Sequence, residues 1–186
     1  MDLKKALTML GSGYLILLVT KATETGPPNV MTLAWCMPVS DSPPLLALAI
    51  NTRSYTAEIL SVTRECTVNV VGKKLLPKAI TAGTLSGRDV DKFAQLGFKS
   101  MPASVVSPPL LGDAIVSLEC TVQQELVVGN HKLYIVAPVN VVAGTGEQGT
   151  ESEAPDEIVV FLGGRKFATL GRLYDYSIQE ETRPTH

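Results

Sequence analysis

Two short apolar runs, at residues 30–36 and 45–51, flank a bend rich in proline, serine and aspartate at residues 38–44. The second run begins LLALAI and lies between Pro-Pro and Asn-Thr. A continuous apolar run of this length between such breakers is typical of a strand buried on both faces. The two runs therefore predict a buried sheet at the centre of the fold.

The polar sequence NTRSYT at residues 51–56 follows the second run directly. It predicts a corner where the strand gives way to a helix over residues 54–64, with Ser54 as the N-cap. A helix N-terminus carries unpaired N–H groups and a partial positive charge. With Arg53 beside it, the corner is suited to binding an anion.

The remaining pattern is mostly that of strands. They are predicted at residues 14–20, 66–71, 114–128, 132–143, 158–162 and 166–170. The first of these forms a hairpin with residues 30–36, and the last two close the sheet. Polar or proline-rich segments are expected as a connector, a solvated loop and a frayed tail, at residues 101–112, 144–157 and 179–186.

Helices are predicted to be few and short. One covers residues 2–11, and the helix at 54–64 is expected to pack through Ala57, Ile59, Leu60 and Val62. An interrupted helical segment covers residues 75–98, with a small-residue break at 82–87, a cap at Asp89 and an end at Gly97.

Six to eight strands with hairpin-like spacing thus outnumber two or three short helices. Closing the sheet removes exposed strand edges, so the economical architecture is mainly β, a closed antiparallel barrel with short flanking helices. At 186 residues the chain suits a single domain over residues 1–186.

Composition excludes several classes of partner. Sixteen Lys and Arg against 18 Asp and Glu give no strong field toward nucleic acid or anionic lipid. No apolar stretch approaches the roughly eighteen residues needed to span a membrane, so we expect a cytoplasmic protein. The three cysteines are widely spaced without a C-x-x-C pair and are expected as buried, reduced thiols.

Several familiar sites are also excluded. The sequence GTGEQG at residues 144–149 matches a dinucleotide-binding pattern, but an acidic run follows it in place of an amphipathic helix. The only histidines, His131 and His186, have no metal-ligand spacing to cysteine, so no metal site is expected. No G-x-S-x-G elbow supplies a hydrolase nucleophile. Taken singly, His131 fits a solvated hairpin residue and Trp35 a core residue.

Six ordered blocks carry a stronger signal. They are NVMTLAW at 29–35, PVSDSPPLLALAI at 38–50, RSYT at 53–56, SGRDVDKF at 86–93, LEC at 118–120 and GNHKLYI at 129–135. In these blocks the chain resembles the flavin reductase-like proteins, which bind FMN in a split β-barrel, and flavoredoxins in particular. The resemblance implies a Greek-key-like antiparallel barrel with noncovalent FMN between the two subunits of a homodimer.

The resemblance also implies which residues contact the flavin. Asn29 and Met31 match contacts to the ring and ribityl chain, Trp35 matches an aromatic residue near the ring, and Phe167 matches an aromatic residue late in the family's sequences, often tyrosine.

A second set matches polar contacts. Arg53, Thr56 and Lys92 correspond to partners of the ribityl-phosphate end, which suits the need of a phosphate for positive charge and donors. His131 corresponds to the histidine of the family's G-D-H motif and is a candidate to stabilise the negative charge of a reduced flavin. Asn130 stands where that motif has aspartate, which removes a carboxylate partner of His131.

Flavin carries the redox chemistry in such proteins, so no protein nucleophile is required. The resemblance leaves open an NAD(P)H-dependent flavin or ferric reductase, with NADH or NADPH as donor, and a flavoredoxin-type carrier that a redox protein partner reduces. A flavin-binding sensor or store without turnover is a third possibility. A more remote one is a barrel like that of pyridoxamine-phosphate oxidase, with another ligand.

Overall fold

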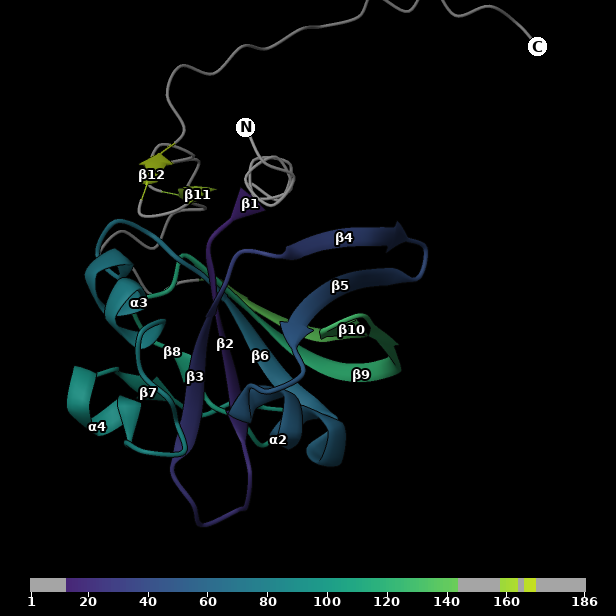
Figure 1. Cartoon of the computed structure of the whole chain (residues 1–186), viewed down its shortest axis with the longest axis horizontal. Coiled ribbons are helices and arrows are strands. Elements are labelled where there is room, and N and C mark those ends of the chain that lie inside the picture. Colours follow the sequence, from purple (N-terminus) through teal and green to yellow (C-terminus); the bar gives the residue numbers. More distant parts are fainter. Residues whose placement is uncertain (1–12, 144–157, 164–165, 170–186) are drawn as a thin grey trace, which may run out of the picture.

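The structure, a computed structural model, describes residues 13–143, 158–163 and 166–169. A seven-stranded antiparallel sheet dominates it, with the strand order β3-β2-β6-β9-β10-β5-β4 (Figure 1). Its strands are β2 (Ile16–Lys21), β3 (Pro28–Leu33), β4 (Cys36–Asp41), β5 (Pro44–Asn51), β6 (Glu65–Val70), β9 (Val116–Val128) and β10 (His131–Ala143). The predicted hairpin near the N-terminus is confirmed, since β2 pairs with β3.

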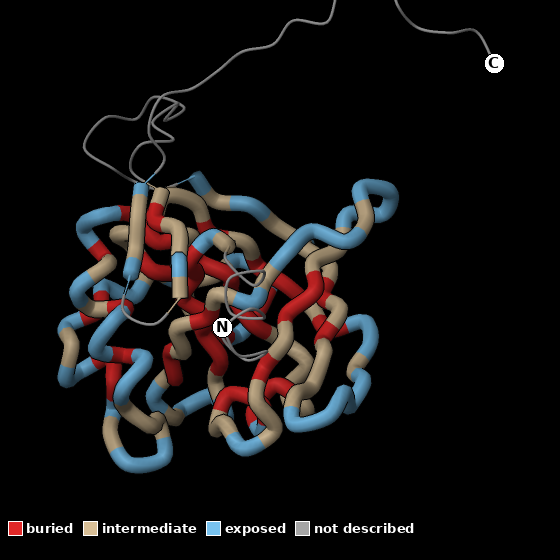
Figure 2. The backbone as a smooth tube through the Cα atoms, turned by 45° about the horizontal axis from the view of Figure 1, so that its top comes forward, coloured by how far each residue is buried: buried red, intermediate tan, exposed pale blue. Residues whose placement is uncertain are grey.

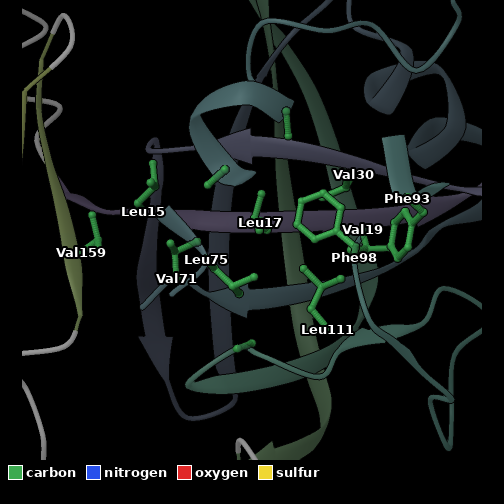
Figure 3. Packing of buried hydrophobic residues seen from close by; sticks show 13 residues of the cluster. Leu15, Leu17, Val19, Val30, Val71, Leu75, Phe93, Phe98, Leu111 and Val159 are labelled. Atoms are coloured by element: carbon green, nitrogen blue, oxygen red, sulfur yellow. The ribbon is translucent and has the colours of Figure 1, made fainter. Parts of the chain in front are cut away.

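Strand β2 is buried on both faces and separates two hydrophobic clusters. Leu17 and Val19 belong to the first cluster, which Figure 3 shows with Phe93 and Phe98. Ile16 and Leu18 point the other way into the second cluster, as the period of two residues in a strand requires. Figure 2 shows the buried segments crossing the middle of the molecule while the turns remain exposed.

The bend predicted at residues 38–44 is shorter in the structure, because strand β4 occupies most of it. Residues 36–41 form the edge strand β4, so the chain turns only at Ser42-Pro43, a cis peptide bond. Pro38 is tolerated because an edge strand leaves one row of N–H groups unpaired, and the register shifts between Pro38 and Ser40. The strand predicted at 30–36 accordingly ends at Leu33.

The burial predicted for β5 is only partly correct. Leu48 and Ile50 are buried in the second cluster, whereas Leu45 and Ala49 are half-buried. The strands buried on both faces are β2, from Ile16 to Thr20, and β6, from Cys66 to Asn69.

The three helices of the described residues are short. They are α2 (Tyr55–Thr63), α3 (Leu76–Ala82) and α4 (Lys92–Leu96), and α3 and α4 lie beside β3 (Figure 1). Ser54 caps α2 as predicted, but Val62 is 80% exposed, so the prediction that it packs is wrong. The cap of α4 is Asp91 and not Asp89, because the helix begins only at Lys92; Gly97 ends it as predicted.

Two smaller sheets complete the described structure. Strand β11 (Val159–Gly163) pairs with β1 (Gly13–Tyr14) and with β12 (Lys166–Thr169) in a separate three-stranded sheet, so the prediction that β11 and β12 close the main sheet is wrong. Strands β7 (Ser100–Met101) and β8 (Leu110–Leu111) pair within the predicted connector.

The predicted fold class is confirmed as mainly β, with antiparallel strands. The predicted helix at 2–11, loop at 144–157 and tail at 179–186 lie outside the described residues. Cys66 and Cys120 are buried and face each other across β6 and β9, and all three cysteines are free thiols. No helix in the described ranges is long and apolar enough to cross a membrane.

Candidate functional site

The polar corner predicted after β5 forms a tight, capped turn. The Ser54 hydroxyl accepts a hydrogen bond from the N–H of Ala57 at 3.1 Å, and the Asn51 carbonyl oxygen Oδ1 accepts one from the N–H of Arg53 at 3.0 Å. The N–H of Thr52 donates to the carbonyl of Asn130 at 3.1 Å, which ties the corner to the β9–β10 hairpin. The corner therefore lies beside His131, the residue that follows Asn130.

Asn29, at the start of β3, is linked to this corner. Its Nδ2 donates to the Thr56 hydroxyl at 2.9 Å and to the Thr20 hydroxyl at 3.4 Å, and all three side chains are buried. Its Oδ1 is also buried but has no hydrogen-bond partner among the described residues. An unpaired buried acceptor costs about 1–3 kcal/mol, so this oxygen is suited to a donor from a ligand.

A pocket of about 350 Å³ opens beside Asn29. It lies between the β2–β3 turn, the start of α2 and the segment that leads into α4. Its lining residues are Ala22, Thr23, Gly26, Pro27, Pro28, Asn29, Tyr55, Gly87, Arg88, Asp89, Val90 and Asp91.

Gly87 is required where the pocket wall meets Asn29. A Cβ at this position would lie 2.0 Å from Asn29 Oδ1 and 3.1 Å from Cδ1 of Tyr55. Any side chain at residue 87 would therefore displace the unpaired oxygen or the aromatic ring.

Arg88 braces the same wall. One guanidinium nitrogen donates to the carbonyl of Arg53 at 3.1 Å, another pairs with Glu58, and the guanidinium carbon lies 5.5 Å from the centre of the Tyr55 ring. Sequence reasoning did not single out Gly87, Arg88 or Tyr55, although the blocks SGRDVDKF and RSYT contain them.

Trp35 and His131 form an aromatic pair. Their ring centres are 5.0 Å apart and their planes are tilted by 34°. Nδ1 of His131 lies 2.7 Å from Oδ1 of Asn130; since that oxygen can only accept, Nδ1 carries the proton and Nε2 is left for a ligand. Trp35 is 41% exposed, so it is not the core residue that a lone tryptophan suggests by itself.

Three other residues predicted to contact the flavin lie in surroundings that differ from one another. Met31 is half-buried against the second cluster, and Arg53 is exposed in the corner. Phe167 packs on Phe161 at a ring distance of 5.6 Å and against the first cluster.

Lys92 is buried, and its ammonium donates to the carbonyls of Val30 and Ala82, both at 2.9 Å. Burial lowers the pKa of this ammonium. The structure thus brings Asn29 and Thr56 into contact, as it does Trp35 and His131, whereas Lys92 joins β3 to the end of α3 from inside.

Comparison with known proteins finds several relatives by sequence. An uncharacterised Archaeoglobus fulgidus protein is 32% identical over 143 residues, which cover 76% of this chain and 81% of that one. The reductase component of a 4-nitrophenol 4-monooxygenase/4-nitrocatechol 2-monooxygenase from Rhodococcus opacus is 27% identical over 128 residues, 69% of this chain. The chain spans 65% of the Rhodococcus protein's length, just under two thirds.

Among solved structures, a flavoredoxin from Methanosarcina acetivorans superposes with a TM-score of 0.80 at 19% identity, covering 92% of this chain and 91% of its own. That likeness shows a shared fold. The sequence model of the flavin reductase like domain matches residues 9–170, most of the chain. The chain therefore belongs to the flavin reductase like domain family.

Proposed function

We propose that the protein is an FMN-binding oxidoreductase that passes electrons through a noncovalently held FMN, with NADH or NADPH as donor. The observation that carries this proposal is Asn29 Oδ1, a buried acceptor without a partner among the described residues, in a chain of the flavin reductase like domain family. A ribityl hydroxyl is a donor of the kind that this oxygen lacks.

The residues around Asn29 fit the other parts of FMN. The start of α2 offers unpaired N–H groups with Arg53 and Thr56 beside them, which suits the phosphate. Trp35 and His131 offer an aromatic surface for the isoalloxazine ring, and Met31 on β3 stays a predicted contact of the ring. In this proposal Lys92 adds positive charge from beneath β3, and Phe167 stays a predicted contact near the ring.

FMN, when bound, supplies the hydride and electron-transfer chemistry. The chain's own part is to bind and orient it and to stabilise charge. His131 holds its Nδ1 proton on Asn130, so a protonated ring directs its second N–H, on Nε2, toward the ligand side. Asn29 is fixed by Thr56 and Thr20, which orients its free oxygen before any ligand binds.

Two neighbours support different electron donors. The Rhodococcus relative is the reductase component of a monooxygenase, which supports the NAD(P)H-dependent reading. The Methanosarcina structure is a flavoredoxin, which supports the alternative of a carrier reduced by a redox protein partner. A flavin-binding sensor without turnover is favoured by no observation of its own.

We also propose that the protein is a homodimer with FMN near the subunit interface. Supporting this is an exposed apolar stretch along the edge strand β4, where Met37 is 61% exposed and Val39 44% exposed, with Trp35 immediately before it. A second copy that covered this edge would shield it from water.

The visible spectrum of the purified protein, followed by anaerobic additions of NADH and NADPH, tests the proposal. We expect yellow protein that bleaches quickly with a nicotinamide. Bleaching only with dithionite or a reduced partner protein would favour the carrier. Colourless protein that also fails to take up added FMN would overturn the flavin proposal.

A further inference from the structure

A polar network fixes helix α2 to the β9–β10 hairpin. The Ser61 hydroxyl of α2 lies 2.8 Å from the Tyr134 hydroxyl and 2.8 Å from Oε1 of Glu125, so its one proton is shared between these two oxygens. Lys132 donates to the Ser61 hydroxyl at 2.7 Å and forms an ion pair with Glu125 at 2.6 Å. The network thus joins α2, β9 and β10 through side chains that the proposed flavin contacts do not use.

The charged members of the network hold each other ionised. Burial by itself would raise the pKa of Glu125, but hydrogen bonds from Lys132 and Ser61 outweigh it and lower that pKa. The hydrogen bond with Glu125 in turn raises the pKa of Lys132. Arg64, which ends α2, pairs with the other carboxylate oxygen of Glu125 at 3.3 Å. The network therefore stays charged at neutral pH and ties the end of α2 as well as its middle.

Tyr134 extends the network to the start of α2. This side chain is wholly buried, and its hydroxyl donates to the carbonyl of Ala57, in the first turn of the helix, at 2.9 Å. Ala57 also gives its N–H to the capping hydroxyl of Ser54. One residue of the first turn is therefore attached both to the cap and to β10.

This first turn keeps two N–H groups for a ligand. The N–H groups at the beginning of a helix have no intrahelical partner. In α2 the N–H of Ser54 bonds the Asn51 carbonyl at 3.0 Å and that of Ala57 bonds Ser54. Within the described part of the chain, those of Tyr55 and Thr56 remain. Because they point along the helix axis, whatever fixes α2 also fixes their direction.

The hairpin that holds α2 also carries His131. A second tie is the hydrogen bond of 3.1 Å from the N–H of Thr52 to the carbonyl of Asn130. A movement of α2 against the hairpin would therefore change the spacing between the first turn of α2 and His131. A binding site has to hold such spacings within about 0.5 Å.

We propose that Tyr134, Ser61 and Lys132 are positioning residues for the phosphate of FMN. They hold α2 so that its remaining N–H groups meet the phosphate while His131 faces the ring. The inference rests on the proposed FMN binding. The three side chains act through α2, so their loss weakens the phosphate contacts. Riboflavin lacks the phosphate and depends on the ring contacts, which these side chains do not orient.

Tyr134→Phe tests the inference, because it removes one hydroxyl and keeps the buried ring. In cofactor-free protein we expect the Kd for FMN to rise about five- to tenfold and the Kd for riboflavin to stay within about twofold of wild type. Ser61→Ala, which removes the central hydroxyl, has the same selective effect. The matched control is Thr63→Val, which removes an α2 hydroxyl that bonds the Ile59 carbonyl inside the helix.

Fluorescence titrations with FMN and with riboflavin give the ratio of the two Kd values. A preference for FMN that shrinks in Tyr134→Phe and Ser61→Ala, but not in Thr63→Val, supports the positioning role. An unchanged preference, an equal loss for both ligands, or the same change in Thr63→Val overturns that role and leaves the proposed FMN binding intact. Wild-type protein that binds neither ligand overturns the proposed function, and the inference with it.

Discussion

Asn29 and Thr56 join the first residues of β3 to the first turn of α2 through a buried hydrogen bond of 2.9 Å from Nδ2 to the hydroxyl. The bond fixes which way the Asn29 amide faces, because its nitrogen is consumed by Thr56 and Thr20 and its oxygen is left unpaired. Two segments 27 residues apart in sequence thereby present one acceptor beside the pocket.

Asn29→Ala removes this acceptor. We expect the Kd for FMN to rise on the order of tenfold, because one hydrogen bond to a buried group is lost on the ligand side. Fluorescence titration of the cofactor-free protein with FMN measures this Kd. Thr81→Ala is the control, since that exposed hydroxyl bonds only within α3. Equal FMN affinity in the two variants would exclude Asn29 as a flavin contact.

Gly87→Ala places a methyl group 2.0 Å from Asn29 Oδ1. We expect it to displace the amide or the Tyr55 ring, weakening FMN binding and costing about 1–3 kcal/mol of folding stability. Gly83→Ala is the matched control, because its Cβ would meet nothing closer than 3.4 Å. Chemical denaturation and FMN titration measure both effects; wild-type values for Gly87→Ala would contradict the close approach.

His131→Ala removes the partner of Trp35 and the candidate donor near the flavin. We expect a more negative flavin potential or weaker FMN binding, with little change in unfolding, because the side chain lies at a hairpin end and not in either cluster. Spectroelectrochemical titration gives the potential and thermal melting gives the stability. A variant with unchanged affinity and unchanged potential would remove His131 from the site.

Glu119 is a buried carboxylate that holds the segment before β8. Burial alone would raise its pKa, but hydrogen bonds from the N–H groups of Ser104, Val105 and Val106 and from Asn140 outweigh it and lower the pKa. The ionised carboxylate therefore stabilises the fold at pH values above the ordinary carboxyl pKa. This stabilisation is lost as the pH falls through the lowered pKa of Glu119.

Glu119→Gln should accordingly cost about 3 kcal/mol at neutral pH, because a charged acceptor of several N–H groups is replaced by a neutral one. Urea unfolding measured at neutral and at acidic pH checks this, and the cost should shrink at the lower pH. Glu24→Gln, an exposed turn residue, should change stability by less than about 0.5 kcal/mol. Similar costs for the two variants would show that Glu119 carries no such role.

Much of the fold is determined locally and was readable from the sequence. Alternation and breakers located the hairpin of β2 and β3 and the long pair β9 and β10, and Ser54 was identified as a cap from its place after a strand. The six sequence blocks also identified the family, and the match of the flavin reductase like domain over residues 9–170 confirms it.

Other features depended on contacts between distant segments. Pro38 reads as a breaker, and only its place on an edge strand explains why β4 continues through it. From the sequence alone Lys92 would be a solvated surface cation. In the structure its ammonium donates hydrogen bonds to the carbonyls of Val30 in β3 and Ala82 in α3. No local pattern predicts either outcome.

The sequence by itself therefore determined the β-rich class, the capped corner and the family, since these follow from neighbours along the chain. Only the tertiary structure decided that Asn29 keeps an unpaired oxygen, that Gly87 must lack a side chain and that Arg88 faces Tyr55. Those properties come from the packing of β3, α2 and the segment before α4, and packing is set by all three at once.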